Sequence, residues 1–177
     1  PREGAETTEE LEKIWRNRAV SDAFEPGSIF KVITAIAALE EGVVDEHTTF
    51  QCNGKHVVNG VTINCWKPNG HGKQNLSDII KNSCNPGFIQ LAEIIGKETL
   101  QKYIKLLGFG QSTGIDLPGE GNGIIKDLES MSDLDLATIS FGHTNSVISV
   151  QYMAAFNAIA NGGTWITPHL LKEVVTR

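Results

Sequence analysis

A serine and a lysine three residues apart are the first residues of this chain that could perform chemistry together. Ser28 and Lys31 lie in the stretch EPGSIFKVITAIAALEEG. Their spacing predicts a helix with both side chains on one face, a turn apart. A helix that begins at Ser28 also places backbone N–H groups beside the hydroxyl, where they can stabilise an oxyanion. The pair therefore predicts a serine nucleophile with a lysine partner.

Lys31 stands at an unfavourable position for a charged side chain. The expected helix, residues 28–41, is apolar almost throughout and should be buried on all sides. Burial and the positive end of the helix dipole both favour the neutral amine over the ammonium ion. A neutral amine can take a proton from a serine, so we expect Lys31 to be the general base for Ser28. The alternative is an N-cap serine followed by a lysine that extends to solvent.

A second serine and an asparagine form the next candidate element. Ser83-Cys84-Asn85 lies at the gap between two predicted helices. The pattern S-x-x-K followed by S-x-N is typical of serine enzymes that react with penicillins. Helix capping is the alternative role, because both residue types cap helices well. In the presence of the first pair, we expect Ser83 and Asn85 to be catalytic.

Five motifs occur in a fixed order along the chain: EPGSIFK, GHG, SCN, TGIDLPGE and SFG. With this order and spacing, the chain resembles the transpeptidase domain of the class B penicillin-binding proteins. The resemblance extends over almost the whole chain and is closest to the stage V sporulation D type. It implies an α+β fold, the α/β sandwich of penicillin-binding proteins and serine β-lactamases, of which this chain would supply the helical part and a peripheral hairpin.

The resemblance also implies a function, a peptidoglycan D,D-transpeptidase that β-lactams acylate. Ser28 would attack the carbonyl between two D-alanines of a stem peptide, and Lys31 would accept its proton. Ser83 would relay that proton towards the leaving group, while Asn85 would hydrogen-bond the substrate backbone. The implied partners are peptidoglycan stem peptides, β-lactam antibiotics and a separate glycan polymerase. The implied location is the extracytoplasmic face of the cell membrane, with a role in spore or cell-wall synthesis.

Two departures from the family pattern stand out. The family carries a K-T-G strand downstream of the region TWITPHL, and the chain contains no Lys-Thr-Gly tripeptide. We therefore expect residues 1–177 to be a partial transpeptidase domain that ends before the K-T-G strand, lacks the C-terminal sheet strands and is inactive alone. The look-alike GHTN lacks the required glycine. In it, His143 and Thr144 replace the family's Gln-Gly, which would alter a loop near the site.

Two other functions stay open at this point. A serine β-lactamase would share Ser28 and Lys31 but needs a base for deacylation, and no E-x-x-L-N-type loop follows Asn85. A catalytically silent penicillin-binding sensor or structural domain is the second alternative. The intact serine, lysine and asparagine positions argue against it.

Composition excludes several other classes. The chain has 177 residues, of which 40% are hydrophobic and 20% charged, with a net charge of −6; these values are ordinary for a globular domain. No stripe of Lys and Arg is present, so we expect no nucleic-acid partner. No apolar run reaches the length of about 18 residues needed to span a membrane, so attachment is expected only through an anchor outside this chain.

The periodicity predicts mostly helices, with one hairpin. The hairpin, HVVNGVTI, has Asn59-Gly60 as its turn. Residues 18–24 are expected to be extended, residues 69–75 to be loop, and the region from Thr164 to start a strand. Helices are expected over 6–17, 28–41, 76–82, 86–96, 97–108, 131–137 and 149–160.

Three cysteines and a histidine form a candidate metal site: Cys52, Cys65, His71 and Cys84. Regular pairing from the hairpin turn places residue 54 opposite 65, so Cys52 would be a diagonal neighbour of Cys65. Cys₃His is a recognised structural zinc set, although the spacing is not that of a standard finger. The prediction is a structural zinc ion, with no cofactor required for the chemistry.

Each of these residues also has another explanation. Cys52 and Cys65 could form a disulfide, which an extracytoplasmic setting permits. Cys84 could be a small buried hydrophobe, and His71 could orient its Gly-His-Gly loop by a hydrogen bond. The sequence leaves the zinc ion, the disulfide and free thiols open.

Overall fold

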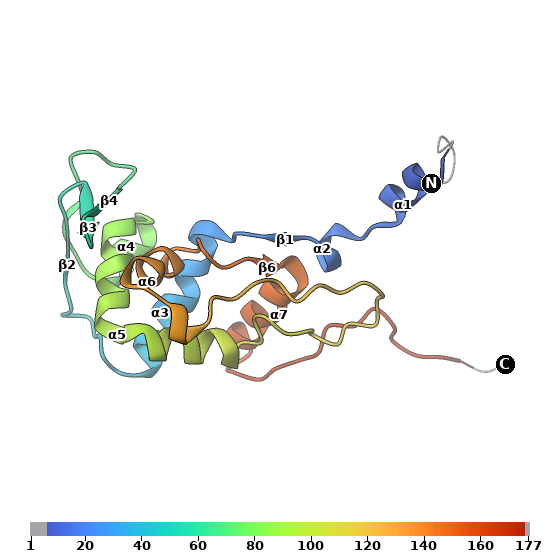
Figure 1. The fold of residues 1–177 in the computed structure, drawn as a ribbon. Helices are drawn as coiled ribbons and strands as arrows, with labels where there is room; N and C mark the ends of the chain where they lie inside the picture. The colour runs from blue at the N-terminus through green and yellow to red at the C-terminus, as the bar shows by residue number, and fades with distance from the viewer. Residues whose placement is uncertain (1–6, 176–177) are drawn as a thin grey trace.

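The computed structural model describes residues 7–175 of the chain. A helical body lies at the centre, with the hairpin at one end and both chain ends directed away from the other (Figure 1). The α-helices are α1 (Thr8–Trp15), α2 (Arg18–Ser21), α3 (Lys31–Glu40), α4 (Leu76–Lys81), α5 (Asn85–Leu106), α6 (Asp133–Ser140) and α7 (Ser149–Ala160). Short 3₁₀ turns, η1 (Gly27–Phe30) and η2 (Leu128–Ser130), precede α3 and α6.

Strands are short and pair in twos, always antiparallel. They are β1 (Ala23–Phe24), β2 (Phe50–Cys52), β3 (Lys55–Val58), β4 (Val61–Asn64), β5 (Gly72–Gln74) and β6 (Val147–Ile148). Within the described residues β1 pairs with β6, β2 with β5, and β3 with β4. The mixture of helices with small antiparallel sheets is that of the predicted α+β class.

The core lies where α3 and α6 pack on α5. Ile33 of α3, Leu91 of α5 and Ile139 of α6 are all fully buried there, and burial of each such side chain stabilises the fold by about 2 kcal/mol. The buried residues of α3 include three with small side chains, Ala35, Ala37 and Ala38. Close packing on these alanines fixes α3, and with it Lys31, against α5.

Local sequence signals set the ends of the helices. Asn75 forms a capping box with Asp78 at the start of α4, and Ser132 forms one with Asp135 at the start of α6. Each box satisfies two backbone N–H groups that a helix start leaves unpaired. Inside α5, Gly96 has non-helical angles, φ 78° and ψ 168°. The predicted break between two helices at this glycine is therefore confirmed.

The predicted hairpin is confirmed, with Val58 opposite Val61 and positive φ at both turn residues, Asn59 and Gly60. Three local predictions were wrong. Part of the stretch 18–24 forms α2, because the Asn17 side chain caps it by accepting from Ala19 N–H. Part of the predicted loop 69–75 forms β5 by pairing with β2. No strand occurs among residues 164–175.

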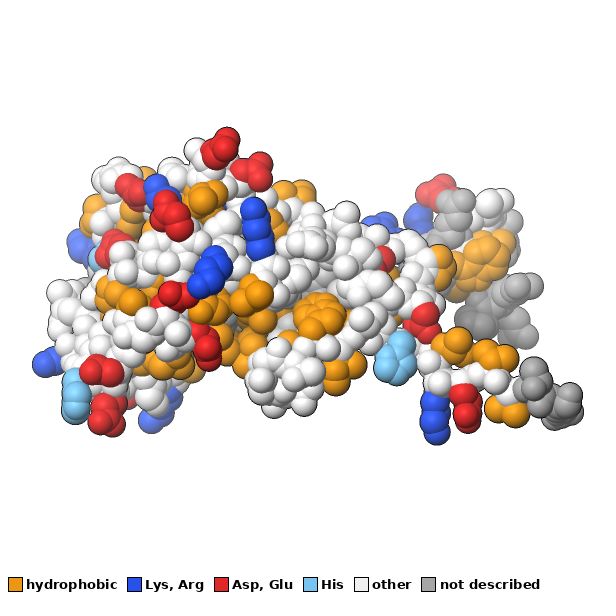
Figure 2. All heavy atoms as spheres, turned by 90° about the horizontal axis from the view of Figure 1, so that it is seen from below, with side chains coloured by type: hydrophobic (Ala, Val, Ile, Leu, Met, Phe, Trp, Pro, Cys, Tyr) orange, Lys and Arg blue, Asp and Glu red, His pale blue; other side chains and the backbone are white. Residues whose placement is uncertain are grey.

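The charged side chains on the surface are distributed as expected from the sequence, which has no stripe of Lys and Arg. On the face shown in Figure 2, acidic and basic side chains are intermixed and form no continuous basic patch. Among the described residues, no helix combines the length and apolar character needed to cross a bilayer.

Candidate active site

Ser28 lies exposed on the tight turn η1 that leads into α3. Gly27 adopts φ +58°, and its N–H donates to the carbonyl of Gly142 at 2.8 Å. A Cβ on Gly142, which has φ +91°, would lie 2.0 Å from the carbonyl oxygen of Gly27. Only glycine at 142 allows this approach, so the SFG segment buttresses the turn that presents Ser28.

The Lys31 amine joins the two predicted elements. Its Nζ lies 3.1 Å from the Oγ of Ser28. It also lies 2.8 Å from both the Oγ and the carbonyl oxygen of Ser83, and 2.7 Å from the Oδ1 of Asn85. The Oγ of Ser83 donates to the Oγ of Ser28 at 3.0 Å. The structure thus brings all four residues predicted as catalytic into one hydrogen-bonded group.

Ser83 reaches this group through an unusual backbone. Its φ is +48°, a left-handed conformation that few non-glycine residues adopt and that strains the chain by about 1–3 kcal/mol. In this conformation its carbonyl and hydroxyl both contact the lysine amine. The N-cap residue of α5 is Cys84, and its side chain makes no capping hydrogen bond. Helix capping therefore does not account for Ser83 and Asn85.

Burial sets the charge preference of Lys31. The residue is 3% exposed, and its Nζ lies 5.5 Å from the centre of the Phe88 ring. Burial lowers the pKa of Lys31 from 10.5 to about 8, within the range useful to a general base near neutral pH. The expected helix 28–41 is only partly confirmed: it begins as the 3₁₀ turn η1, and Ile29 and Leu39 are 45% and 51% exposed. The side of α3 that carries Lys31 is buried, and the alternative of a lysine extended to solvent is excluded.

Proton counting shows what the group can do. A lysine ammonium has three N–H donors and no acceptor, whereas four oxygen contacts surround Nζ. The longest of them is to Ser28. A neutral amine could donate to the Ser83 carbonyl and to Asn85, and its lone pair could accept from Ser28. The arrangement can therefore remove a proton from the serine hydroxyl.

The Glu25 carboxylate, which the sequence did not single out, contacts His143 and Thr144, the two residues that replace the family's Gln-Gly. Glu25 accepts from Thr144 N–H at 3.0 Å and contacts His143 Nδ1 at 2.8 Å. These hydrogen bonds, chiefly the one to His143, lower the pKa of the Glu25 carboxyl. Glu25 belongs to the EPGS motif, so the signal was present. Its partner lies 118 residues away and could not be paired from one sequence.

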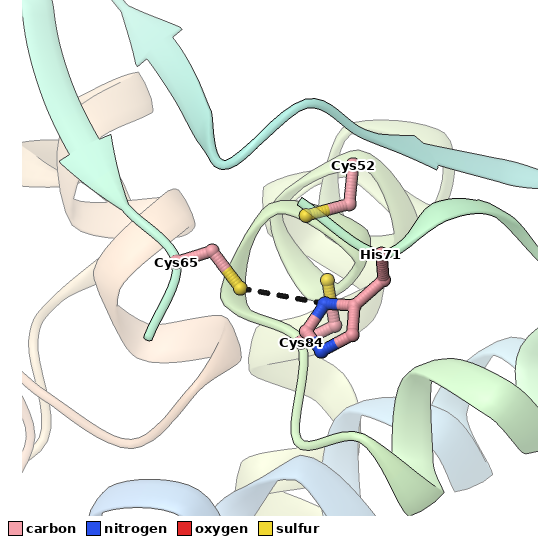
Figure 3. A group of neighbouring side chains, drawn as sticks. All are labelled: Cys52, Cys65, His71 and Cys84. Carbon is pink, nitrogen blue, oxygen red and sulfur yellow. Dashed lines mark hydrogen bonds between the residues drawn. The ribbon is translucent and has the colours of Figure 1, made fainter. Parts of the chain in front are cut away.

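The four predicted metal-ligating residues also come together. The candidate ligand atoms of Cys52, Cys65, His71 and Cys84 all lie within 4.8 Å of one another (Figure 3). The predicted register of the hairpin is confirmed, because Lys55 pairs with Asn64. Cys52, however, lies on β2 and pairs towards β5. The cluster is therefore assembled from two sheets and the α4–α5 junction.

Comparison with known proteins shows the class to which this fold and site belong. The family model described as the penicillin-binding protein transpeptidase domain matches residues 2–176. The chain belongs to this family, as the motifs predicted.

Individual relatives agree with this assignment. The chain is 50% identical to stage V sporulation protein D of Bacillus subtilis (strain 168) over 159 residues, 89% of this chain and 25% of that protein. It is 30% identical to peptidoglycan D,D-transpeptidase FtsI of Buchnera aphidicola subsp. Schizaphis graminum, covering 92% of this chain and 28% of that protein. The chain thus spans about a quarter of the length of these curated relatives.

A solved structure confirms the fold. Penicillin-binding protein 3 of Mycobacterium tuberculosis, complexed with aztreonam, superposes with a TM-score of 0.81 at 31% identity. The match covers 88% of this chain and 35% of that chain. The predicted α+β transpeptidase fold is therefore confirmed.

Proposed function

We propose that the protein is a peptidoglycan D,D-transpeptidase that works through an acyl-enzyme on Ser28. One observation carries the proposal: the buried Lys31 amine contacts the hydroxyls of Ser28 and Ser83 and the side-chain oxygen of Asn85 within 3.1 Å. Family membership and the similarity to a peptidoglycan D,D-transpeptidase support the substrate class.

The first half of the reaction forms the acyl-enzyme. The Oγ of Ser28 attacks the carbonyl carbon of the penultimate D-alanine, and its proton passes to Lys31. Collapse of the tetrahedral intermediate breaks the bond to the terminal D-alanine. The departing amine takes a proton delivered through the hydroxyl of Ser83, which hydrogen-bonds to both Ser28 and Lys31 and so can relay it.

The second half transfers the acyl group. An amine of a neighbouring stem peptide attacks the ester carbonyl and gives up a proton to the base. A new amide forms, and Ser28 recovers its proton. Because Asn85 Oδ1 accepts from Lys31, the Nδ2 group is the part of Asn85 that can donate to a substrate carbonyl. In a β-lactam the broken amide stays tethered, so the serine remains acylated.

Three further parts of the proposal concern the setting. The 50% identity to stage V sporulation protein D supports a role in spore cell-wall synthesis. Peptidoglycan as substrate supports an extracytoplasmic site at the cell membrane. A transpeptidase of this kind needs glycan strands to cross-link, so a separate glycan polymerase is the proposed protein partner.

Labelling with a fluorescent penicillin tests the proposal on the natural full-length protein. We expect a covalent adduct that persists for hours and is absent from Ser28→Ala. Rapid release of the label would indicate a serine β-lactamase instead. Absence of any label from a folded protein would indicate a silent structural or sensor domain. Either result would overturn the proposal.

A further inference from the structure

The cysteine–histidine cluster adjoins the catalytic group, because Cys84 stands between Ser83 and Asn85. It takes no part in the chemistry proposed above. The three cysteines are almost completely buried, with exposed fractions of 0% for Cys52, 6% for Cys65 and 0% for Cys84. Their sulfurs and the Nδ1 side of the His71 ring face one another (Figure 3). Three buried thiols packed around one imidazole are not explained by hydrophobic packing alone.

The backbone is shaped to bring these side chains together. A Cβ on Gly54 would lie 1.9 Å from the Pro68 carbonyl oxygen, and one on Gly70 would lie 2.1 Å from the Cys52 carbonyl oxygen. These glycines let the loop after β4 fold directly onto the end of β2. The Cys65 N–H then donates to the Gly54 carbonyl at 2.8 Å, which places its sulfur beside that of Cys52.

One side-chain N–H donor contacts a sulfur of the cluster: the Nε2 of Gln74 donates to the sulfur of Cys84 at 3.3 Å. Sulfur is a weak acceptor as a thiol and a far better one as a thiolate. A donor at this position therefore suits a metal-bound thiolate and helps to fix its orientation.

The histidine ring points to a ligand rather than to loop orientation. A ring that orients its loop would bond a backbone group. Instead, Nδ1 lies 3.5 Å from the sulfur of Cys65. Nε2 is buried and has no hydrogen-bond partner among the described residues. The ring edge is packed by Trp66, 5.1 Å between centroids, which holds Nδ1 towards the sulfurs.

We propose that Cys52, Cys65, His71 and Cys84 form a tetrahedral zinc site. Three thiolates and one imidazole are a soft donor set that selects zinc over magnesium or calcium. Tetrahedral coordination places ligand atoms about 3.7 Å apart, so ligands that already lie within 4.8 Å of one another need only small side-chain movements. Binding displaces the three thiol protons to solvent.

The site ties distant segments to the catalytic junction. Cys84 is the N-cap of α5 and stands between Ser83 and Asn85. The loop that carries Cys65 and His71 also reaches this junction, because Trp66 Nε1 donates to the Asn82 carbonyl at 2.8 Å. All four zinc positions are filled by protein, so the ion is structural. Its role in positioning Ser83 and Asn85 rests on the proposed function; zinc binding itself does not.

A disulfide accounts for less of this geometry. A bond between Cys52 and Cys65 would use two sulfurs. It would not explain why the Cys84 thiol and the His71 ring lie beside them. Zinc uses all four groups at once. The two possibilities differ in metal content and in the number of thiols that titrate.

Zinc analysis of the natural full-length protein, purified without chelator or reductant, tests the proposal. We expect about one zinc per chain, with Cys52, Cys65 and Cys84 all titratable after denaturation with a chelator, as located by peptide mapping. His71→Asn should lose most of the metal, whereas His47→Asn, an exposed control, should keep it. Less than about a tenth of a zinc, with either one or all of these thiols titratable, would overturn the site in favour of a disulfide or of free thiols.

Cobalt exchange keeps the test decisive if a variant fails to fold. Wild-type protein loaded with Co²⁺ should show the intense visible bands of tetrahedral thiolate-bound cobalt, and weak octahedral bands would contradict the proposal. Removal of zinc from folded protein should slow penicillin acylation about 10- to 100-fold by misplacing Ser83 and Asn85. Ser28→Ala should keep its zinc, so failure of the transpeptidase proposal would leave the metal result intact.

Discussion

Two clusters of reactive side chains meet at the α4–α5 junction, and they are held together in different ways. In the catalytic group, Lys31 hydrogen-bonds to Ser28, Ser83 and Asn85, so each residue already has a partner within the protein. In the sulfur cluster, the contact between candidate ligands is a weak one that involves sulfur, 3.5 Å between the sulfur of Cys65 and Nδ1 of His71. From outside the cluster, the side chain of Gln74 donates to the sulfur of Cys84.

The two clusters depend on different kinds of bond. Oxygen and nitrogen groups satisfy one another by hydrogen bonding, so the catalytic group is organised without an added ion. Thiols are weak hydrogen-bond partners for each other, and the proposed zinc ion would join the sulfurs of this cluster. The comparison predicts that changes in one cluster affect chemistry first, whereas changes in the other affect metal content first.

Lys31→Met should have the largest effect on the catalytic cluster. It removes the base and the shared donor, and we expect penicillin acylation to fall about 10²- to 10⁴-fold. The protein should stay folded, because methionine fills the buried site without a charge. Stopped-flow acylation measures the loss, and Lys105→Met, an exposed site on α5, is the control. Acylation at the normal rate in Lys31→Met would show that Lys31 is not the base.

Gly142→Ala should break the buttress of the Ser28 turn and leave the sulfur cluster intact. The added Cβ would lie 2.0 Å from the Gly27 carbonyl oxygen, so we expect a loss of about 3 kcal/mol in the free energy of unfolding. Gly163→Ala has a similar φ, +86°, but nothing within 4 Å of the new Cβ, and should lose only about 1 kcal/mol. Denaturant unfolding gives both values, and equal losses would refute the buttress.

The pH dependence of acylation gives the smallest of the three effects. Burial lowers the pKa of Lys31 to about 8, and only the neutral amine can accept the serine proton. Acylation should therefore rise with pH, about tenfold between about pH 7 and about pH 9, and level off above that. A rate that falls over this range would mean that the protonated lysine is the reactive form. Residual acylation by Lys31→Met should lack the rise.

The four residues that we propose as catalytic could be located from the sequence because each lies in a short local motif. Ser28 and Lys31 are a helical turn apart, and Ser83 and Asn85 flank one residue. Their spacing encodes a shared face or a shared junction, and the family order of motifs joined the two pairs. The Asn59-Gly60 turn was equally local, so the hairpin and its register were predicted correctly.

The contacts that were missed join residues far apart in the chain. The Glu25 carboxylate contacts His143, and the Gly27 turn rests on Gly142; only the folded chain brings these together. Gly72 belongs to a strand because β2 pairs with it, although Gly-rich sequence favours loops. Tertiary pairing overrode local propensity at these places.

We propose that Ser28, with Lys31 as its base, is the residue that penicillin acylates. Peptide mapping by mass spectrometry, after the natural full-length protein reacts with penicillin, tests this most directly. We expect a single penicilloyl adduct on the peptide that contains Ser28, with none on Ser83. An adduct on Ser83, or an unmodified Ser28 in fully labelled protein, would contradict it.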